Sequence, residues 1–171
     1  MLRYLLPAAA LLLSGCIDMT LPPEKMPITT EKREFLYDYS VPGASKDLLY
    51  TRASEYLAVS YNNSKEVSRV ADKERGTIIA KAVMPWNFTS DTALIPYVVC
   101  YQNYDIVAIA KDGRARLQLT IVDGPRVAST CSWTLPPRRD YPQIVSQFED
   151  IAKSFGEALK GNSNIEKIRD F

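Results

Sequence analysis

The chain has 171 residues and is nearly neutral, with 21 lysine and arginine residues against 20 aspartate and glutamate residues, and it contains no histidine. This length suits one domain with a single hydrophobic core. A charge so close to zero argues against binding to nucleic acid. The lack of histidine removes the commonest general base and metal ligand at neutral pH. We therefore expect no nucleic-acid partner, no cofactor or metal, and no enzymatic activity.

The N-terminus has the layout of a secretory signal. Arg3 precedes an almost wholly apolar stretch, which ends in the run Leu13-Ser14-Gly15-Cys16. The stretch is far shorter than the ~20 residues of a membrane-spanning helix, and the run resembles a lipobox, the processing site of bacterial lipoproteins. We therefore predict cleavage between Gly15 and Cys16 and lipidation of Cys16, by palmitate among other chains, which would anchor the protein in a membrane. An ordinary secretory signal with a coincidental cysteine is the alternative.

The residues after the anchor bear on its location. Ile17, rather than aspartate, follows the cysteine, and by resemblance to sorted bacterial lipoproteins this favours the outer membrane, facing the periplasm, over the inner membrane; Asp18 weakens the assignment. With residues 1–15 removed as a signal peptide, residues 16–32 contain three prolines and no hydrophobic periodicity. We predict a flexible tether there, with a reach of at most about 50 Å.

The first predicted elements are a strand, a helix and a hairpin. Residues 33–41 alternate between apolar and polar side chains, which predicts a strand with three aromatic residues on one face: Phe35, Tyr37 and Tyr39. Ser45 is a suitable N-cap for a helix that runs to about Tyr61. Residues 67–72 and 77–83 flank a short polar segment and predict a hairpin.

The clearest local signal is Asp112-Gly113, which is typical of a two-residue type I′ hairpin turn. This turn sets Lys111 opposite Arg114 and makes one face of the hairpin wholly apolar or aromatic. The pairs on that face are Ala110/Ala115, Ala108/Leu117, Ile106/Leu119 and Tyr104/Ile121. Because the turn rule and the polarity pattern agree, we predict this register.

A second helix follows Asp140, whose spacing to Gln143 resembles a capping box. Its apolar residues form one stripe: Ile144, Phe148, Ile151, Ala152, Phe155, Ala158 and Leu159. Gly161 is a suitable C-cap, and residues 161–171 form a polar tail. The element order β-α-β-β-β-β-α over residues 33–160 predicts one α+β domain, with two helices on one face of an antiparallel sheet.

Two segments fall outside this pattern. Residues 84–103 form an unusually long connection, and residues 127–135 alternate like an additional edge strand. Cys100 and Cys131 lie in these segments, and in an oxidising compartment they most simply form a disulfide; two free, buried cysteines are the alternative. The segments also hold five aromatic residues that could form a partner surface, or else a small satellite core: Trp86, Phe88, Tyr97, Tyr101 and Trp133.

Four stretches, residues 35–45, 49–61, 72–79 and 106–119, resemble a family of bacterial lipoproteins that carry a domain of unknown function with a TBP-like fold, named after the TATA-binding protein. The resemblance covers about residues 33–160. It implies a curved antiparallel sheet backed by helices, and it implies no activity, cofactor or catalytic residue. The fold label does not imply DNA binding.

These observations predict a lipid-anchored cell-envelope protein of unknown biochemical activity. We expect a non-enzymatic interaction or scaffolding module with an envelope protein as its partner. The alternative is a domain that binds a small ligand through the aromatic residues of the segment 84–103.

Overall fold

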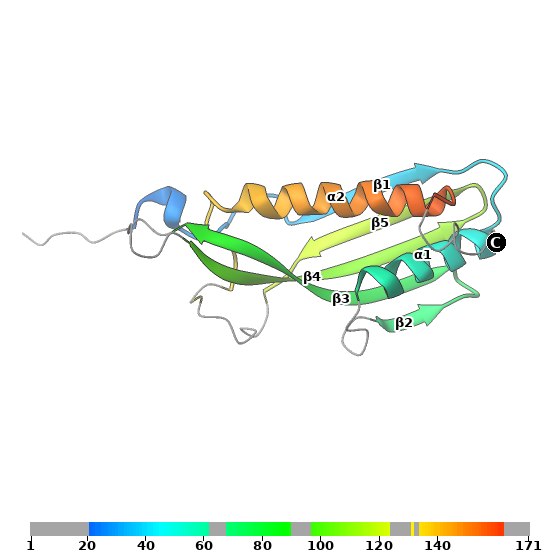
Figure 1. Ribbon diagram of the computed structural model, residues 1–171, viewed down its shortest axis with the longest axis horizontal. Coiled ribbons are helices and arrows are strands. Elements are labelled where there is room, and N and C mark those ends of the chain that lie inside the picture. The colour runs from blue at the N-terminus through cyan, green and yellow to red at the C-terminus, as the bar shows by residue number, and fades with distance from the viewer. Residues whose placement is uncertain (1–20, 62–67, 90–96, 124–130, 132–133, 163–171) are drawn as a thin grey trace, which may run out of the picture.

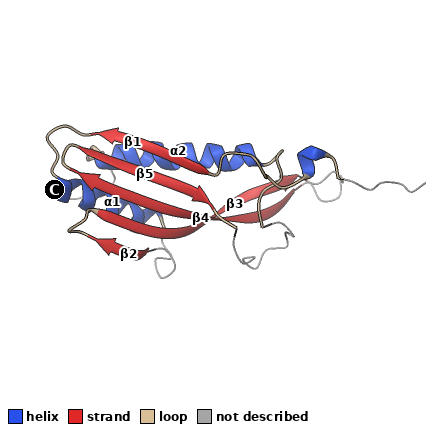
Figure 2. Cartoon of the chain, turned by 180° about the vertical axis from the view of Figure 1, so that it is seen from behind, coloured by secondary structure: helices blue, strands red, loops and turns tan. Residues whose placement is uncertain are grey.

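The structure, a computed structural model, describes residues 21–61, 68–89, 97–123, 131 and 134–162 (Figure 1). One five-stranded antiparallel sheet carries both α-helices on the same face (Figures 1 and 2). The elements are η1 (Pro23–Lys25), β1 (Glu34–Ser40), α1 (Lys46–Ser60), β2 (Ser68–Asp72), β3 (Thr77–Thr89), β4 (Tyr97–Lys111), β5 (Arg114–Ile121) and α2 (Tyr141–Leu159). The predicted α+β class and element order are confirmed.

The strands lie in the order β1-β5-β4-β3-β2, so the connection through α1 passes from one edge of the sheet to the other. The β4–β5 register runs from Lys111↔Arg114 to Tyr104↔Ile121, as predicted. The turn type is different from the prediction, because only Gly113 has a positive φ, +73°, and Asp112 does not. The Asp112 carboxylate instead accepts the backbone N–H of Lys46 at 2.7 Å, which docks the turn on the start of α1.

Helix α1 begins and ends where the sequence indicates. The Ser45 hydroxyl accepts the N–H of Leu48 at 3.2 Å, and Tyr61 is the C-cap. The helix lies beside α2, where the Arg52 guanidinium donates to the Leu159 carbonyl at 2.9 Å. This contact satisfies a carbonyl that the last turn of α2 leaves without an intrahelical partner.

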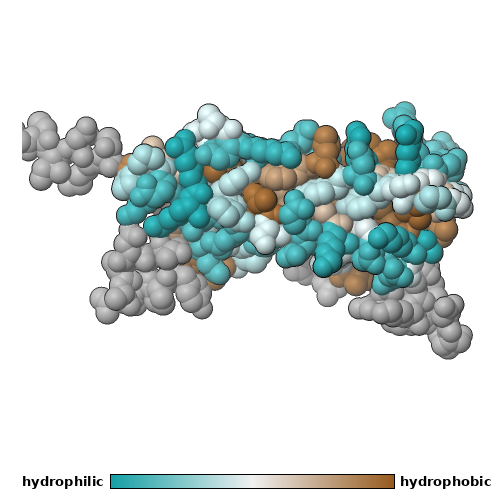
Figure 3. All heavy atoms as spheres, turned by 90° about the horizontal axis from the view of Figure 1, so that it is seen from above, coloured by the Kyte–Doolittle hydropathy of each residue, from teal (hydrophilic) through white to brown (hydrophobic). Residues whose placement is uncertain are grey.

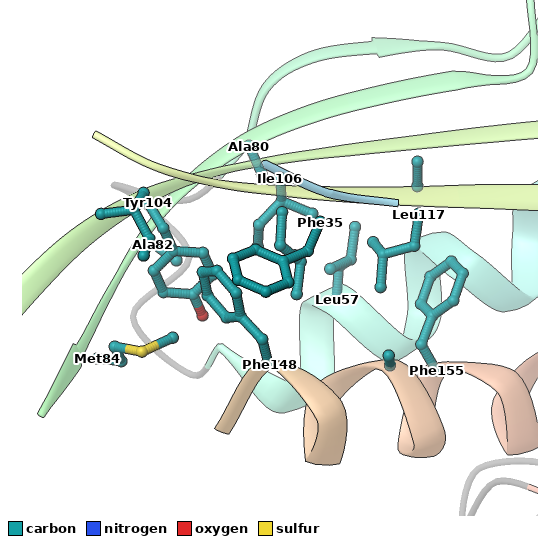
Figure 4. Close-up of a cluster of buried hydrophobic side chains, with 14 of the residues drawn as sticks. Phe35, Leu57, Ala80, Ala82, Met84, Tyr104, Ile106, Leu117, Phe148 and Phe155 are labelled. Atoms are coloured by element: carbon teal, nitrogen blue, oxygen red, sulfur yellow. The ribbon is translucent and has the colours of Figure 1, made fainter. Parts of the chain in front are cut away.

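The core lies between the helices and the sheet. Figure 4 shows Phe148 of α2 pointing between Phe35 and Tyr104, with ring centroids 5.2 and 5.3 Å away. Although Tyr104 is buried, its hydroxyl has a hydrogen-bond partner, the Tyr61 hydroxyl at 2.9 Å. Burial raises the pKa of Tyr61 to about 12. Of the predicted α2 stripe, all but the half-buried Ile151 belong to the core.

The predicted capping box at the start of α2 is wrong. Asp140 is itself in a helical conformation, and its side chain makes no cap hydrogen bond. Gln143 reaches β3 instead: its amide donates to the Asn87 carbonyl at 2.9 Å and accepts the Asn87 N–H at 3.0 Å. Gln147 donates to the Pro85 carbonyl at 2.8 Å. The two glutamine side chains of α2 thus satisfy backbone N–H and C=O groups on the part of the β3 edge that pairs with no described strand, and backbone polar groups in a folded protein require such partners.

The long connection predicted over residues 84–103 is also wrong. Strands β3 and β4 remain paired from Val83↔Asn103 to Thr89↔Tyr97, beyond the end of β5. We call this two-stranded extension, residues 83–89 and 97–103, the arm. The disulfide Cys100–Cys131 links the arm to a residue 31 positions further along the chain, with a Cα–Cα distance of 5.6 Å. The predicted pairing of these cysteines is present.

Most of the predicted tether, residues 21–32, is folded onto the domain. Pro27 forms an isolated β-bridge with Pro137, and the Ile28 N–H donates to the Pro136 carbonyl at 3.0 Å. The Ile28 side chain is only 1% exposed. Residues 21–32 therefore belong to the domain. Burial of the Ile28 side chain is favourable because it removes apolar surface from water, whereas an extended linker would leave that surface exposed.

Several predictions fall outside the described residues. They include the signal peptide, Cys16 and the first part of the tether, most of the edge strand over 127–135, and most of the tail 161–171. Gly161 adopts a positive φ of +87°, as a C-terminal cap requires. Within the described part of the chain, neither helix has the length and apolar character needed to cross a membrane.

Candidate interaction surface on the uncovered sheet face

The sheet face opposite the helices is covered by no described element (Figure 2). Strand alternation places on it the side chains that do not enter the core. Among the residues that the structure describes, six of the ten exposed large apolar side chains lie on this uncovered face: Leu36, Val70, Ile79, Val83, Val99 and Tyr101. A solvated face of an antiparallel sheet usually carries polar side chains, so this concentration makes the face a candidate contact surface.

The apolar residues are aligned across the strands. Val70 pairs with Ile79, which pairs with Val107, so that three strands contribute to one apolar row. Gln118 and Leu36 continue the same row to the β1 edge. By contrast, the side of the molecule viewed from above shows hydrophobic residues only as separate small areas among hydrophilic ones (Figure 3).

Ion pairs flank the apolar row. Arg116 donates two hydrogen bonds to the Asp38 carboxylate, at 2.6 and 2.8 Å, and this contact holds the pKa of Asp38 below its usual range. Lys81 lies 3.2 Å from Asp105. Such exposed pairs add little stability. An apolar centre with a polar rim is nevertheless the ordinary composition of a protein–protein interface.

A hollow of about 620 Å³ opens at the β4–β5 turn end of the uncovered face. Ile109 lines it together with one acidic residue, Asp38, and three cationic residues, Lys111, Arg114 and Arg116. Arg116 is engaged by a carboxylate of β1, whereas neither Lys111 nor Arg114 forms a salt bridge within the described ranges. The hollow therefore presents two positive charges next to an apolar side chain.

Of the five aromatic residues predicted to form a partner surface, Trp86 and Phe88 are not exposed. Trp86 is only 2% exposed, and its ring packs on Phe88 with centroids 6.3 Å apart. Phe88 is half-buried beneath the Arg139 guanidinium, 4.9 Å from the ring centroid. Tyr101 is exposed, at 43%, and belongs to the uncovered face. The side chain of Tyr97 and the whole of Trp133 lie outside the described residues.

The uncovered face was not singled out from the sequence, although a signal was present. The predicted hairpin register already placed Val107 and Ile109 among the polar side chains of its outer face. Their neighbours Ile79 and Val70 come from a hairpin whose register the sequence left open. Only the paired sheet brings Val70, Ile79 and Val107 into one row, whereas Ile109 lies opposite Thr77 in the adjacent row.

No metal centre is built from the described residues, among which no group of three or more histidine, cysteine, aspartate or glutamate side chains converges. Cys100 and Cys131 are not available as free thiols, because they are joined to each other.

Comparisons with known proteins agree with the architecture. A family model described as a domain of unknown function (DUF4468) with TBP-like fold matches residues 35–123. A DUF4468 family protein from Bacteroides ovatus is 19% identical, with a TM-score of 0.53 over 76% of this chain and 90% of that one. A TBP-like protein from Parabacteroides distasonis is 14% identical, with a TM-score of 0.50 over 80% and 98%. No curated protein matches. At these identities the two structures show the fold alone.

Proposed function

Because the chain belongs to the DUF4468 family, whose TBP-like domain has no assigned function, we propose a role from its own surfaces: it is a lipid-anchored, non-enzymatic interaction module of the cell envelope. Its partner is an envelope protein that binds the uncovered sheet face. The observation that carries this proposal is the apolar row across β2, β3 and β4, in which Val70 and Ile79 are exposed and Val107 is half-buried, between two ion pairs.

The size of the uncovered face supports a protein partner. Five strands spaced at about 4.8 Å, each roughly 25 Å long outside the arm, give a face on the order of 600 Å². A stable protein–protein interface buries about 800 Å² on each side. The face and its margins together therefore approach the area that such a partner requires.

Two features of the sequence support the envelope location. The run ending in Cys16 matches a lipoprotein processing site. The Cys100–Cys131 disulfide is typical of proteins that fold in an oxidising compartment such as the periplasm. The outer membrane remains the proposed location, because Ile17 follows the cysteine.

The partner surface can be tested by photo-crosslinking in living cells. A photoreactive amino acid is placed at Ile79 or Val107 on the uncovered face, and at exposed Lys153 on α2 as the matched control. We expect a discrete adduct of the same mass from both face positions and none from the helix position. Recovery of only the monomer from both face positions contradicts the proposal.

The anchor has its own test. Cells grown with labelled palmitate should label the wild-type chain, and Cys16→Ala should abolish the label. A variant that retains the label refutes lipidation at Cys16.

A second candidate function is the binding of a small anionic ligand in the hollow at the β4–β5 turn. It is favoured by the charges of Lys111 and Arg114, which no described carboxylate neutralises within salt-bridge distance, next to Ile109. A site built from the aromatic residues of the arm has less support, because Trp86 is buried. Titration with inorganic phosphate and with succinate, followed by NMR, tests the hollow. Shifts confined to this region that disappear in Lys111→Ala support it, and unchanged spectra contradict it.

A further inference from the structure

We infer that the end of the domain formed by η1, the start of α2 and the tip of the arm lies against the membrane surface, and that the β4–β5 turn points away from it. We call these the arm end and the far end. In Figure 1 they lie at opposite ends of the long axis, and the chain enters the domain at the arm end. The inference rests on the proposed lipidation of Cys16.

The first argument is that the N-terminal segment is fixed to the arm end. Three backbone hydrogen bonds of 3.0 Å join it to the residues before α2: Arg139 N–H to Glu24 O, Arg138 N–H to Met26 O, and Ile28 N–H to Pro136 O. Side chains strengthen the attachment. The Arg138 guanidinium bonds the Thr29 hydroxyl at 2.9 Å, and the Tyr141 hydroxyl donates to the Lys32 carbonyl at 2.7 Å.

The second argument is the length of chain that remains free. Only five peptide units separate Cys16 from Leu21, the first described residue, and five extended residues span at most about 18 Å. The 15 residues of β4, which run from the arm end to the far end, extend about 50 Å. A tether of 16 residues would let either end approach the bilayer. The short linker keeps the arm end close to it.

The third argument is the chemistry of the surface where the chain meets the lipid. Leu21 and Met26 are 49% and 44% exposed and flank η1. Exposed apolar side chains beside a lipid anchor can enter the headgroup region, since burial there removes them from water. Of the ten exposed large apolar residues in the described ranges, four do not lie on the uncovered face: these two, and Leu48 and Val59 of α1.

The uncovered face itself is not expected to lie on the bilayer. Its described side chains include four acidic and four basic residues, a balance that gives them no net attraction to anionic headgroups: Glu34, Asp38, Asp72 and Asp105, and Lys81, Lys111, Arg114 and Arg116. The face therefore stays accessible to a protein partner, and the hollow at the far end lies on the order of 50 Å from the membrane.

Fluorescence quenching by lipid headgroups tests this orientation. The lipidated full chain is reconstituted in phosphatidylcholine vesicles that contain a headgroup-spin-labelled lipid. A fluorophore is attached at Met26→Cys at the arm end or at Glu74→Cys in the β2–β3 turn at the far end; both positions are exposed. Since Cys16 carries lipid and Cys100 is in the disulfide, each variant offers one free thiol.

We expect loss of most of the fluorescence at position 26 and no loss at position 74. Inserting twelve Gly/Ser residues between Thr20 and Leu21 should weaken the quenching at position 26, because the longer linker frees the domain. Equal quenching at both positions, or stronger quenching at position 74, overturns the orientation while leaving the anchor intact. If mass spectrometry finds no acyl chains on the protein and the protein does not co-float with the vesicles in a density gradient, the proposed anchoring is refuted, and this inference with it.

Discussion

Replacing Gly76 by alanine should destabilise the protein much more than the same replacement at Gly113. Both glycines have a positive φ, +66° and +73°. A Cβ at Gly76 would lie 2.5 Å from the Ala110 carbonyl oxygen, which is backbone, whereas a Cβ at Gly113 would meet no atom within 4 Å. The two variants therefore differ in the steric contact alone.

The magnitudes follow from these geometries. An alanine in a left-handed conformation lowers the free energy of unfolding by about 1–2 kcal/mol. Replacing glycine by alanine also reduces the entropy of the unfolded chain, which offsets ~0.4–1 kcal/mol of this loss. We expect Gly113→Ala to lower the free energy of unfolding by about 1 kcal/mol. Gly76→Ala must also displace β4 and lengthen the 2.8 Å hydrogen bond from the Ala110 N–H to the Gly76 carbonyl. With about 1 kcal/mol for that bond and more for the displacement, the loss should be about 2–4 kcal/mol.

Urea denaturation followed by tryptophan fluorescence measures both variants against wild type at one pH. Linear extrapolation gives the free energy of unfolding in water. A drop of 3 kcal/mol would also lower the Tm by roughly 6–12 °C for a chain of this size. Equal losses in the two variants would refute the reasoning, because the close approach of β4 at Gly76 would then have no energetic consequence.

Three further outcomes are expected. Replacing both Cys100 and Cys131 by serine should lower the free energy of unfolding by ~3–4 kcal/mol, because their separation of 31 residues sets the loop entropy; an unchanged urea midpoint contradicts this. Gln143→Ala should remove both side-chain bonds to Asn87 and speed hydrogen exchange at the Asn87 amide, and unaltered exchange would show that the edge is protected otherwise. Burial raises the pKa of Asp140 above 3.8, so its contribution to stability is complete below that pH and is lost as pH rises through the raised value. In urea titrations the stability of Asp140→Asn relative to wild type should therefore increase as the pH is raised from acid to neutral, and a difference that is constant with pH contradicts this.

The arm shows why part of the fold escaped prediction. Pro85 interrupts the strand pattern, and proline normally argues against a strand interior. In the structure, the backbone N–H and C=O of Asn87 face the edge of β3 away from β4. Pro85, two residues earlier, has the same backbone orientation, so its lack of an N–H removes no hydrogen bond to β4. Gln147 of α2, more than sixty residues later, bonds the Pro85 carbonyl. No local pattern around Pro85 contains that partner.

The N-terminal segment escaped prediction for a similar reason. Its three prolines and lack of periodicity are typical of a linker. Pro27 can pair in the structure because its partner is Pro137, so that neither residue has an N–H to leave unsatisfied. The burial of Ile28 depends on the same distant segment. The candidate surface is likewise a product of sheet pairing, which aligned apolar residues that are far apart in the chain.

The sequence by itself determined the element order, the limits of α1 and the β4–β5 register. The limits of α1 depend on interactions between residues that are close in sequence, such as the Ser45 cap. The β4–β5 register depends on the position of one turn and on the alternation of apolar and polar side chains on both sides of it. The sequence also favoured the pairing of Cys100 and Cys131, because no other cysteine remains after the predicted anchor, and the structure decided between this disulfide and two free cysteines. Tertiary structure alone decided the length of the arm, the docking of residues 21–32 and the exposure of the apolar row. Each of these features depends on residues that are distant in the chain. Their side chains or backbone groups supply the hydrogen bonds and apolar contacts that neighbouring residues in the sequence cannot provide.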